Sequence, residues 1–62
     1  MPVITVAVDK LNEEKKKKLV EHLTKEAADI TGYPADYFFV YIQEYATENI
    51  GVGGKTIREI RG

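Results

Sequence analysis

The segment that decides the fold is Met1-Pro2-Val3-Ile4-Thr5-Val6-Ala7-Val8. Its β-branched and small apolar residues predict a strand from about Pro2 to Val8, because such side chains fit a pleated surface. The bulkier side chains of Ile4, Val6 and Val8 alternate along this strand and share one face. We therefore expect that face to pack against a helix.

Pro2 has two interpretations. Proline suits the first residue of a strand, because it has no N–H to donate to the ladder. A small residue at position 2 also usually allows removal of an initiator methionine, which would leave Pro2 with a free secondary amine. An amine in a dry, cationic pocket loses proton affinity and can act as a base near neutral pH. Both interpretations stay open on this residue alone.

Length and composition limit the possible architectures. A chain of 62 residues forms one domain, predicted here as 1–62, and is marginally stable as a monomer. The sequence has no cysteine and a single histidine, His22, so we expect neither disulfides nor a metal site. We also expect no cofactor. Oligomerisation then remains as the expected source of stability.

The charge and hydropathy patterns predict the cellular context. The formal net charge of −1 does not suggest a nucleic-acid partner. The lysine run 15–18 is flanked by acidic residues, so we expect it on a solvated helix face rather than in a phosphate-binding patch. No apolar run approaches the length of a membrane span, and no signal peptide precedes the first strand. We therefore expect a cytoplasmic protein with no membrane partner.

A helix is predicted from Glu13 to about Thr31. Asn12 is a favourable N-cap residue, and Gly32 provides a left-handed stop. Apolar residues recur at helical spacing and form one stripe; they are Leu19, Leu23, Ala27 and Ile30, widened by Val20 and Ala28. The remaining faces carry mostly charged residues, so the stripe should pack on the sheet.

A second strand is predicted from about Tyr37 to Tyr45, after a turn over residues 33–36. One face is apolar and should meet the helix; it consists of Phe38, Val40 and Ile42. The other face is aromatic with polar groups and should line either a pocket or a subunit interface; it consists of Phe39, Tyr41, Gln43 and Tyr45. Two strands joined by one helix predict a βαβ unit of α/β class, with parallel strands and a right-handed crossover.

The end of the chain is expected to form a short hairpin or arm. Residues 46–49 form an irregular link, and three glycines between positions 51 and 54 indicate a tight reversal. Gly54-Lys55-Thr56 resembles the end of a phosphate-binding loop, but Asn49 stands where that pattern needs glycine. Because only six residues follow Thr56, we reject a nucleotide site.

Taken together, these features resemble the 4-oxalocrotonate tautomerase (2-hydroxymuconate tautomerase) family. The resemblance rests on Pro2 opening a strand, a βαβ unit of this length, Glu44 late in the second strand, and Ile50-Gly51-Val52-Gly53-Gly54 near the end. It implies a hexamer built as a trimer of dimers, in which two protomers form a four-stranded sheet. It also implies an isomerase whose amino-terminal proline moves a proton from the oxygen side of a dienol acid to a carbon. Pro2 is then the catalytic residue.

The sequence departs from the family pattern where the substrate would bind. Family members that act on dicarboxylates carry one arginine at the start of the second strand and another before the helix. Here Phe39 and Leu11 stand at those positions, and Ile50 replaces an aromatic residue. Lys10, Arg58 and Arg61, from the same or a neighbouring chain, are therefore the candidates for a replacement cation. The predicted substrate-binding residues are Phe39, Tyr41, Ile50, Arg61 and Lys10.

This resemblance and these departures leave three candidate functions. The first is a tautomerase that acts on a 2-hydroxydienoate or an arylpyruvate enol, with Pro2 as general base. The second is proline-assisted hydration of an unsaturated acid, which needs an activating carboxylate, whereas Glu44 is expected to point to the core side. The third is a non-catalytic oligomeric binding module that kept the fold, and the missing arginines favour it.

Overall fold

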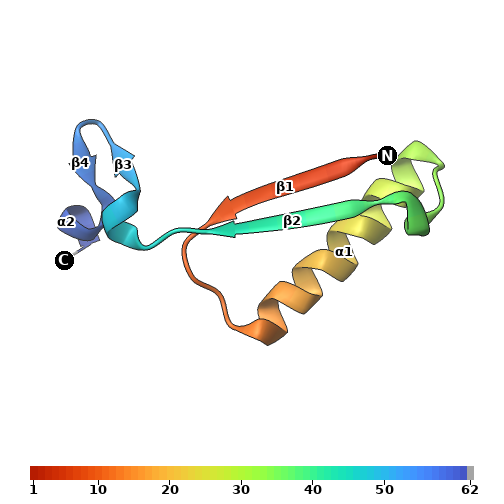
Figure 1. Cartoon of the computed structure of the whole chain (residues 1–62), viewed down its shortest axis with the longest axis horizontal. Coiled ribbons are helices and arrows are strands. Elements are labelled where there is room, and N and C mark those ends of the chain that lie inside the picture. The colour runs from red at the N-terminus through yellow and green to blue at the C-terminus, as the bar shows by residue number, and fades with distance from the viewer. Residues whose placement is uncertain (62) are drawn as a thin grey trace.

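A computed structural model describes residues 1–61 (Figure 1). Gly62, the last residue of the predicted domain, lies outside the described residues. The elements in chain order are β1 (Val3–Val8), α1 (Glu13–Thr31), β2 (Phe39–Glu44), β3 (Gly51–Val52), β4 (Lys55–Thr56) and α2 (Ile57–Arg61). Two 3₁₀ turns, Ala35–Tyr37 and Thr47–Asn49, flank β2.

β1 and β2 form a parallel pair joined by α1, so the predicted βαβ unit is confirmed. Their register runs from Val3 opposite Phe39 to Val8 opposite Glu44. Because the strands are parallel, their carboxyl ends meet at the same end of the sheet. The loop that leaves β1 and the segment that leaves β2 therefore start side by side.

The caps of α1 are those that the sequence predicts. The Asn12 side-chain oxygen accepts a hydrogen bond of 2.8 Å from the Lys15 N–H. At the other end, Gly32 adopts a φ of 81°, and its N–H donates to the Ala28 carbonyl oxygen over 2.9 Å. The predicted helix bounds are therefore confirmed.

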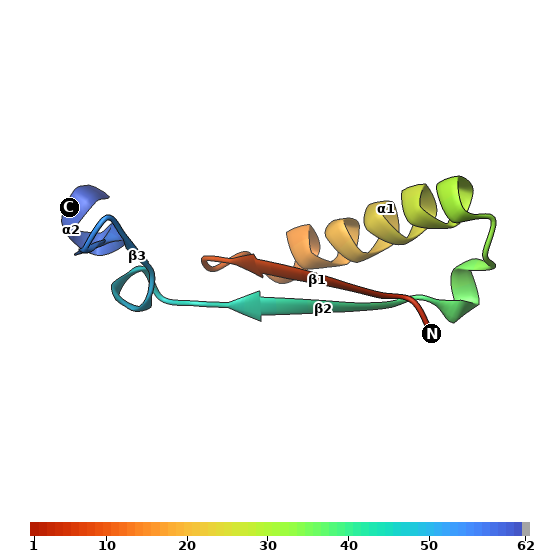
Figure 2. The ribbon, with the colours of Figure 1, turned by 90° about the horizontal axis from the view of Figure 1, so that it is seen from above.

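The helix covers one face of the sheet and leaves the other open, as Figure 2 shows. Ile4, Val6 and Val8 are half-buried, whereas the alternating residues of β1 are exposed. On the uncovered face, Phe39 is 47% and Tyr41 49% exposed. None of the residues described is fully buried in the single chain. The chain thus has no core closed on all sides within residues 1–61.

Two details of the prediction were wrong, the start of β2 and the packing of Ile30. β2 begins at Phe39 rather than Tyr37, because Ala35–Tyr37 forms a 3₁₀ turn in which the Phe38 N–H donates to the Ala35 carbonyl oxygen over 3.1 Å. Ile30 is 82% exposed and does not extend the packed stripe of α1. The 19-residue helix is about 28 Å long and the six-residue strands about 20 Å, so the sheet is too short to cover the whole stripe.

The predicted arm is a hairpin followed by a helical turn. Gly53 and Gly54 connect β3 to β4 with φ values of 61° and 88°, the left-handed region that a tight two-residue hairpin turn requires. Lys55 and Thr56 lie in β4, and the five-residue helix α2, which we did not predict, follows directly. The glycine-lysine-threonine sequence therefore belongs to a hairpin strand.

The chain is elongated, with extents of 42 × 24 × 15 Å. The amino terminus lies at one end of the long axis and the arm at the other (Figure 1). Within residues 1–61, no helix has the length and apolar character needed to cross a bilayer.

Candidate functional site

The first group of predicted site residues lies where the two strands begin. We call Pro2, Phe39 and Tyr41 the strand-start cluster. Pro2 directly precedes β1 and is half-buried, and its carbonyl oxygen accepts a hydrogen bond of 3.0 Å from the Phe39 N–H. Phe39 and Tyr41 are two residues apart on β2, so both side chains point to the uncovered face of the sheet. This cluster combines a proline nitrogen with aromatic surface.

The second group lies where the strands end. We call Lys10, Ile50 and Arg61 the loop-and-arm cluster. Lys10 lies in the loop after β1 and lines an open groove of about 340 Å³. Tyr45 and the first residues of the 3₁₀ turn Thr47–Asn49 line the same groove. Ile50 lines a neighbouring, largely apolar pocket of about 330 Å³, to which Val8 and Tyr45 also contribute.

The two clusters lie apart within one chain. The six residues of β1 separate Pro2 from the loop that carries Lys10. At about 3.3 Å per residue, that strand places them roughly 20 Å apart. The single chain therefore places Phe39 beside Pro2 and Tyr41 further along the same face, opposite Thr5. It does not bring Lys10, Ile50 or Arg61 to Pro2.

The three candidate cations differ in their pairing. Arg61 donates to the Asp9 carboxylate over 2.9 Å, and Arg58 donates to Glu48 over 3.0 Å. Lys10 forms no ion pair with another residue in the range 1–61. Among the three, Lys10 is thus the cation whose charge is not engaged by a carboxylate of its own protomer.

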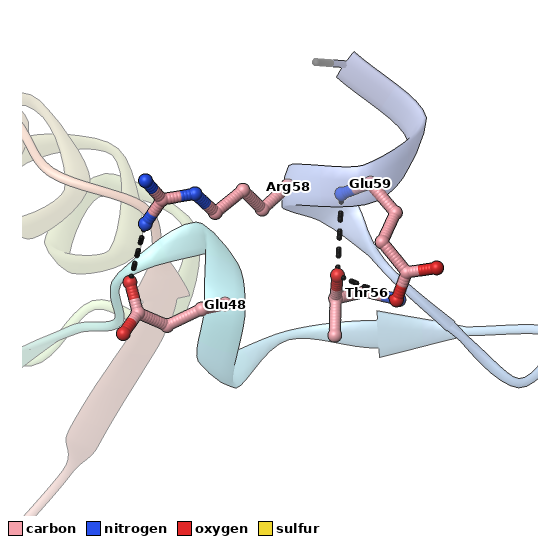
Figure 3. A network of polar contacts seen from close by, with 4 residues as sticks. All are labelled: Glu48, Thr56, Arg58 and Glu59. Atoms are coloured by element: carbon pink, nitrogen blue, oxygen red, sulfur yellow. Dashed lines mark hydrogen bonds and ion pairs between the residues drawn. The ribbon is translucent and has the colours of Figure 1, made fainter.

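The arm that carries Ile50 is held together by its own polar contacts (Figure 3). The Thr56 N–H donates to Glu59 over 3.2 Å, and the Glu59 N–H donates to the Thr56 hydroxyl over 3.2 Å, which forms a reciprocal capping box at α2. The Ile57 N–H donates to the Ile50 carbonyl oxygen over 2.8 Å. These bonds fix Ile50 relative to α2.

One polar residue has a larger role than the sequence suggested. Glu44 ends β2 on the side that faces α1, as expected, and its Oε2 accepts a hydrogen bond of 2.9 Å from the Leu11 N–H. Its Oε1 lies 2.6 Å from Nζ of Lys16. The hydrogen bond from Lys16 lowers the pKa of Glu44 from its ordinary value, and the hydrogen bond from the Leu11 N–H lowers it further by a smaller amount. The period-two pattern of β2 placed Glu44 on the helix side, but it carried no sign of the contact with Leu11.

The comparisons with known proteins agree with this architecture. Residues 2–60 match the family model described as tautomerase enzyme. The chain is 35% identical over 60 residues to a probable tautomerase of Bacillus cereus, covering 95% of this chain and 98% of that protein. The chain belongs to the tautomerase family.

Solved structures give the same result at the level of the fold. TomN, a 4-oxalocrotonate tautomerase homologue in the tomaymycin biosynthetic pathway, superposes with a TM-score of 0.93 at 30% identity, covering 97% of this chain and 94% of its own. DmpI from Archaeoglobus fulgidus is 44% identical, with a TM-score of 0.86 and coverage of 92% and 98%. The fold is that of the 4-oxalocrotonate tautomerases, and family membership supports a tautomerase-type function.

Proposed function

We propose that this protein is an isomerase that converts an enol acid to its conjugated keto form, with the Pro2 nitrogen as general base. The main support for this proposal is the position of Pro2 in the fold. It is half-buried at the start of β1, beside Phe39, and the match to the tautomerase family begins at this residue. Its nitrogen becomes basic only when Met1 is removed, because a peptide nitrogen has no available lone pair.

The proposed reaction moves one proton and needs no other reactant. The Pro2 nitrogen takes the proton from the enol hydroxyl, and the electrons of the O–H bond form the carbonyl. The double bonds shift along the conjugated chain, and the prolinium ion returns the proton to a carbon of the substrate. A base with a proton affinity near the working pH serves both steps. Atoms and charge balance, and no metal or cofactor takes part.

The substrate that we propose is a 2-hydroxydienoate or an arylpyruvate enol. Phe39 and Tyr41 supply aromatic surface beside Pro2, and each is about half exposed in the protomer. Phe39 also stands where family members that act on dicarboxylates carry an arginine. An apolar or aromatic substrate with a single carboxylate therefore fits this cluster better than a dicarboxylate does.

The proposed active form is a hexamer in which a neighbouring chain completes the site. The two clusters lie roughly 20 Å apart in one chain, so a site that uses both would take the second cluster from another chain. The uncovered sheet face and the arm supply apolar surface for this contact, with Tyr45 40%, Val52 56% and Ile60 56% exposed. Residues 1–62 would act as a single domain in that assembly.

The alternative function is a non-catalytic oligomeric binding module. Its support is specific: neither family arginine is present, and two of the three candidate cations, Arg58 and Arg61, already pair with carboxylates of their own chain. A module of this kind would assemble through the same surfaces and bind acids without turnover. Activity measurements on protein without Met1 separate the two functions.

The test compares three preparations on phenylenolpyruvate and on 2-hydroxymuconate, followed by ultraviolet absorbance. The first is wild-type protein whose intact mass lacks methionine, which should ketonise at least one of the two enols. The second is Pro2→Ala, and the third is wild-type protein that retains Met1. Both should lose at least about 100-fold in kcat, the usual size of a general-base contribution, with unchanged sedimentation. Full activity in either preparation, or no turnover by the first, contradicts the proposal.

A further inference from the structure

Side chains from distant parts of the sequence hold the loop between β1 and α1 on both sides of Lys10. On one side, the Asp9 carboxylate accepts a hydrogen bond of 2.9 Å from the Arg61 guanidinium. On the other side, the Leu11 N–H donates a hydrogen bond of 2.9 Å to Oε2 of Glu44. Lys10 itself is exposed. Lys10 is therefore an exposed cation between two residues, Asp9 and Leu11, that are held by hydrogen bonds.

Glu44 is placed to fix this loop. It is the last residue of β2 and lies opposite Val8, so its carboxylate is next to the point where the loop leaves β1. Its second oxygen binds the Lys16 ammonium group, which comes from the start of α1. One carboxylate thus joins the end of β2, the backbone of the loop and the helix, and its side chain is only 28% exposed.

Glu44 forms its ion pair with Lys16 and not with Lys10. The charged groups that face Glu44 are Lys16 on α1 and, more weakly, Lys10 on the loop. Both carboxylate oxygens are occupied, one by the Lys16 ammonium group and the other by the Leu11 N–H. Since Lys10 has no ion pair with a carboxylate of residues 1–61, its ammonium group is available to an external anion, and it lies in the groove that Tyr45 also lines.

We propose that Glu44 is a positioning residue that orients Lys10 to bind the carboxylate of the substrate. This proposal rests on the proposed function, since it assigns the substrate carboxylate to Lys10. Glu44 acts on the peptide that follows Lys10 and makes no contact with substrate itself. Loss of the Leu11 hydrogen bond lets that peptide rotate, so the ammonium group samples other directions and binds an anion more weakly.

The test measures binding without turnover, with 3-phenylpropanoate as the probe, an aromatic monocarboxylate that has no enol. Calorimetry on protein without Met1 gives the Kd for the wild type and each variant. Glu44→Ala should raise the Kd about tenfold, and Lys10→Met should do the same, because each removes or misplaces one charge-assisted contact. Glu44→Gln keeps an oxygen acceptor for the Leu11 N–H and should raise the Kd about threefold at most.

The double variant distinguishes positioning from general stabilisation. Glu44→Ala should add less than about twofold when Lys10 is already methionine, because residues that act through one contact are not additive. Asp29→Ala is the matched control: it removes an exposed carboxylate that pairs with Lys25 over 3.3 Å on α1, and it should leave the Kd unchanged. An additive double variant, an unchanged Kd in Glu44→Ala, or no binding by the wild type overturns the proposal.

Kinetic measurements distinguish failure of this proposal from failure of the proposed function. With phenylenolpyruvate, Glu44→Ala should raise KM about tenfold while kcat stays within about twofold, the pattern of lost ground-state binding. A fall in kcat without a rise in KM would overturn the positioning role. Failure of the proposed function has a different signature, because Pro2→Ala would then keep its turnover while the binding results for Lys10 and Glu44 stand independently.

Discussion

The Phe39 amide donates a 3.0 Å hydrogen bond to the Pro2 carbonyl oxygen, which extends the β1–β2 ladder by one residue beyond β1. This bond ties the residue with the proposed catalytic nitrogen to the first residue of β2. Among the residues of β2, Phe39 therefore lies nearest to the start of β1. Its chemistry should influence which substrates Pro2 can act on.

Phe39→Arg should shift the substrate preference toward dicarboxylates. A guanidinium group at this position supplies a charge-assisted, bidentate partner for a second carboxylate. We expect kcat/KM for 2-hydroxymuconate, relative to phenylenolpyruvate, to rise about tenfold, as one such contact allows. Steady-state kinetics on both enols measures the ratio.

Tyr37→Arg is the control for this change. Tyr37 lies in the 3₁₀ turn before β2 and is 58% exposed. An arginine at this position adds the same charge near Phe39 but not on the strand. This variant should leave the ratio within about twofold, because an exposed charge that does not meet the second carboxylate as a bidentate partner contributes little. An equal shift in both variants, or none in Phe39→Arg, would show that position 39 does not face the substrate.

Glu44 should make the stability of the protein depend on acid pH. Its pKa lies below the ordinary value of 4.5 in the folded chain, because Lys16 and the Leu11 N–H favour the charged form. Such a carboxylate stabilises the folded state above the unfolded pKa, and this contribution is lost as pH falls through the folded pKa. The wild type should therefore unfold at a higher temperature than Glu44→Gln near pH 6, with a gap that closes below pH 4.5.

The measurement is a series of thermal unfolding midpoints at one protein concentration, because assembly makes the midpoint concentration-dependent. Below the folded pKa, wild-type Glu44 is protonated and resembles glutamine in charge. A gap that keeps its full size at every pH below 4.5 at which the protein still folds would mean that the ion pair with Lys16 does not set the difference.

Tyr41→Asp should weaken the proposed assembly. Tyr41 is 49% exposed on the uncovered sheet face, where a charge would have to be buried on association. Sedimentation should show species smaller than the wild type at equal concentration. Tyr33→Asp, which alters an aromatic residue that is 55% exposed outside the sheet, should assemble like the wild type. Identical sedimentation of wild type and Tyr41→Asp would remove this face from the interface.

The sequence predicted the elements whose signals are local. Asn12 and Gly32 marked both ends of α1, and the alternation of Ile4, Val6 and Val8 identified the covered face of β1. The start of β2 was misplaced, because the residue before Phe39 has the same apolar character as a strand residue, and only backbone hydrogen bonds distinguish a 3₁₀ turn from an extended chain.

The candidate site was less accessible to sequence reasoning, because its contacts join residues far apart in the chain. Arg61 pairs with Asp9 across 52 positions, and Glu44 binds the Leu11 N–H across 33. No periodicity connects such residues. The short helix α2 was also missed, although Thr56 and Glu59 have the spacing of a capping box, a local signal that the sequence analysis did not use.

The central claim is that the Pro2 nitrogen is a free amine whose environment makes it a base near neutral pH. Titration of this nitrogen by ¹⁵N NMR, in protein labelled at proline and shown by intact mass to lack Met1, tests it directly. The account predicts a protonation midpoint well below that of the same amino-terminal sequence in an unstructured peptide. A midpoint equal to that of the peptide would contradict it, as would native protein in which Met1 remains attached.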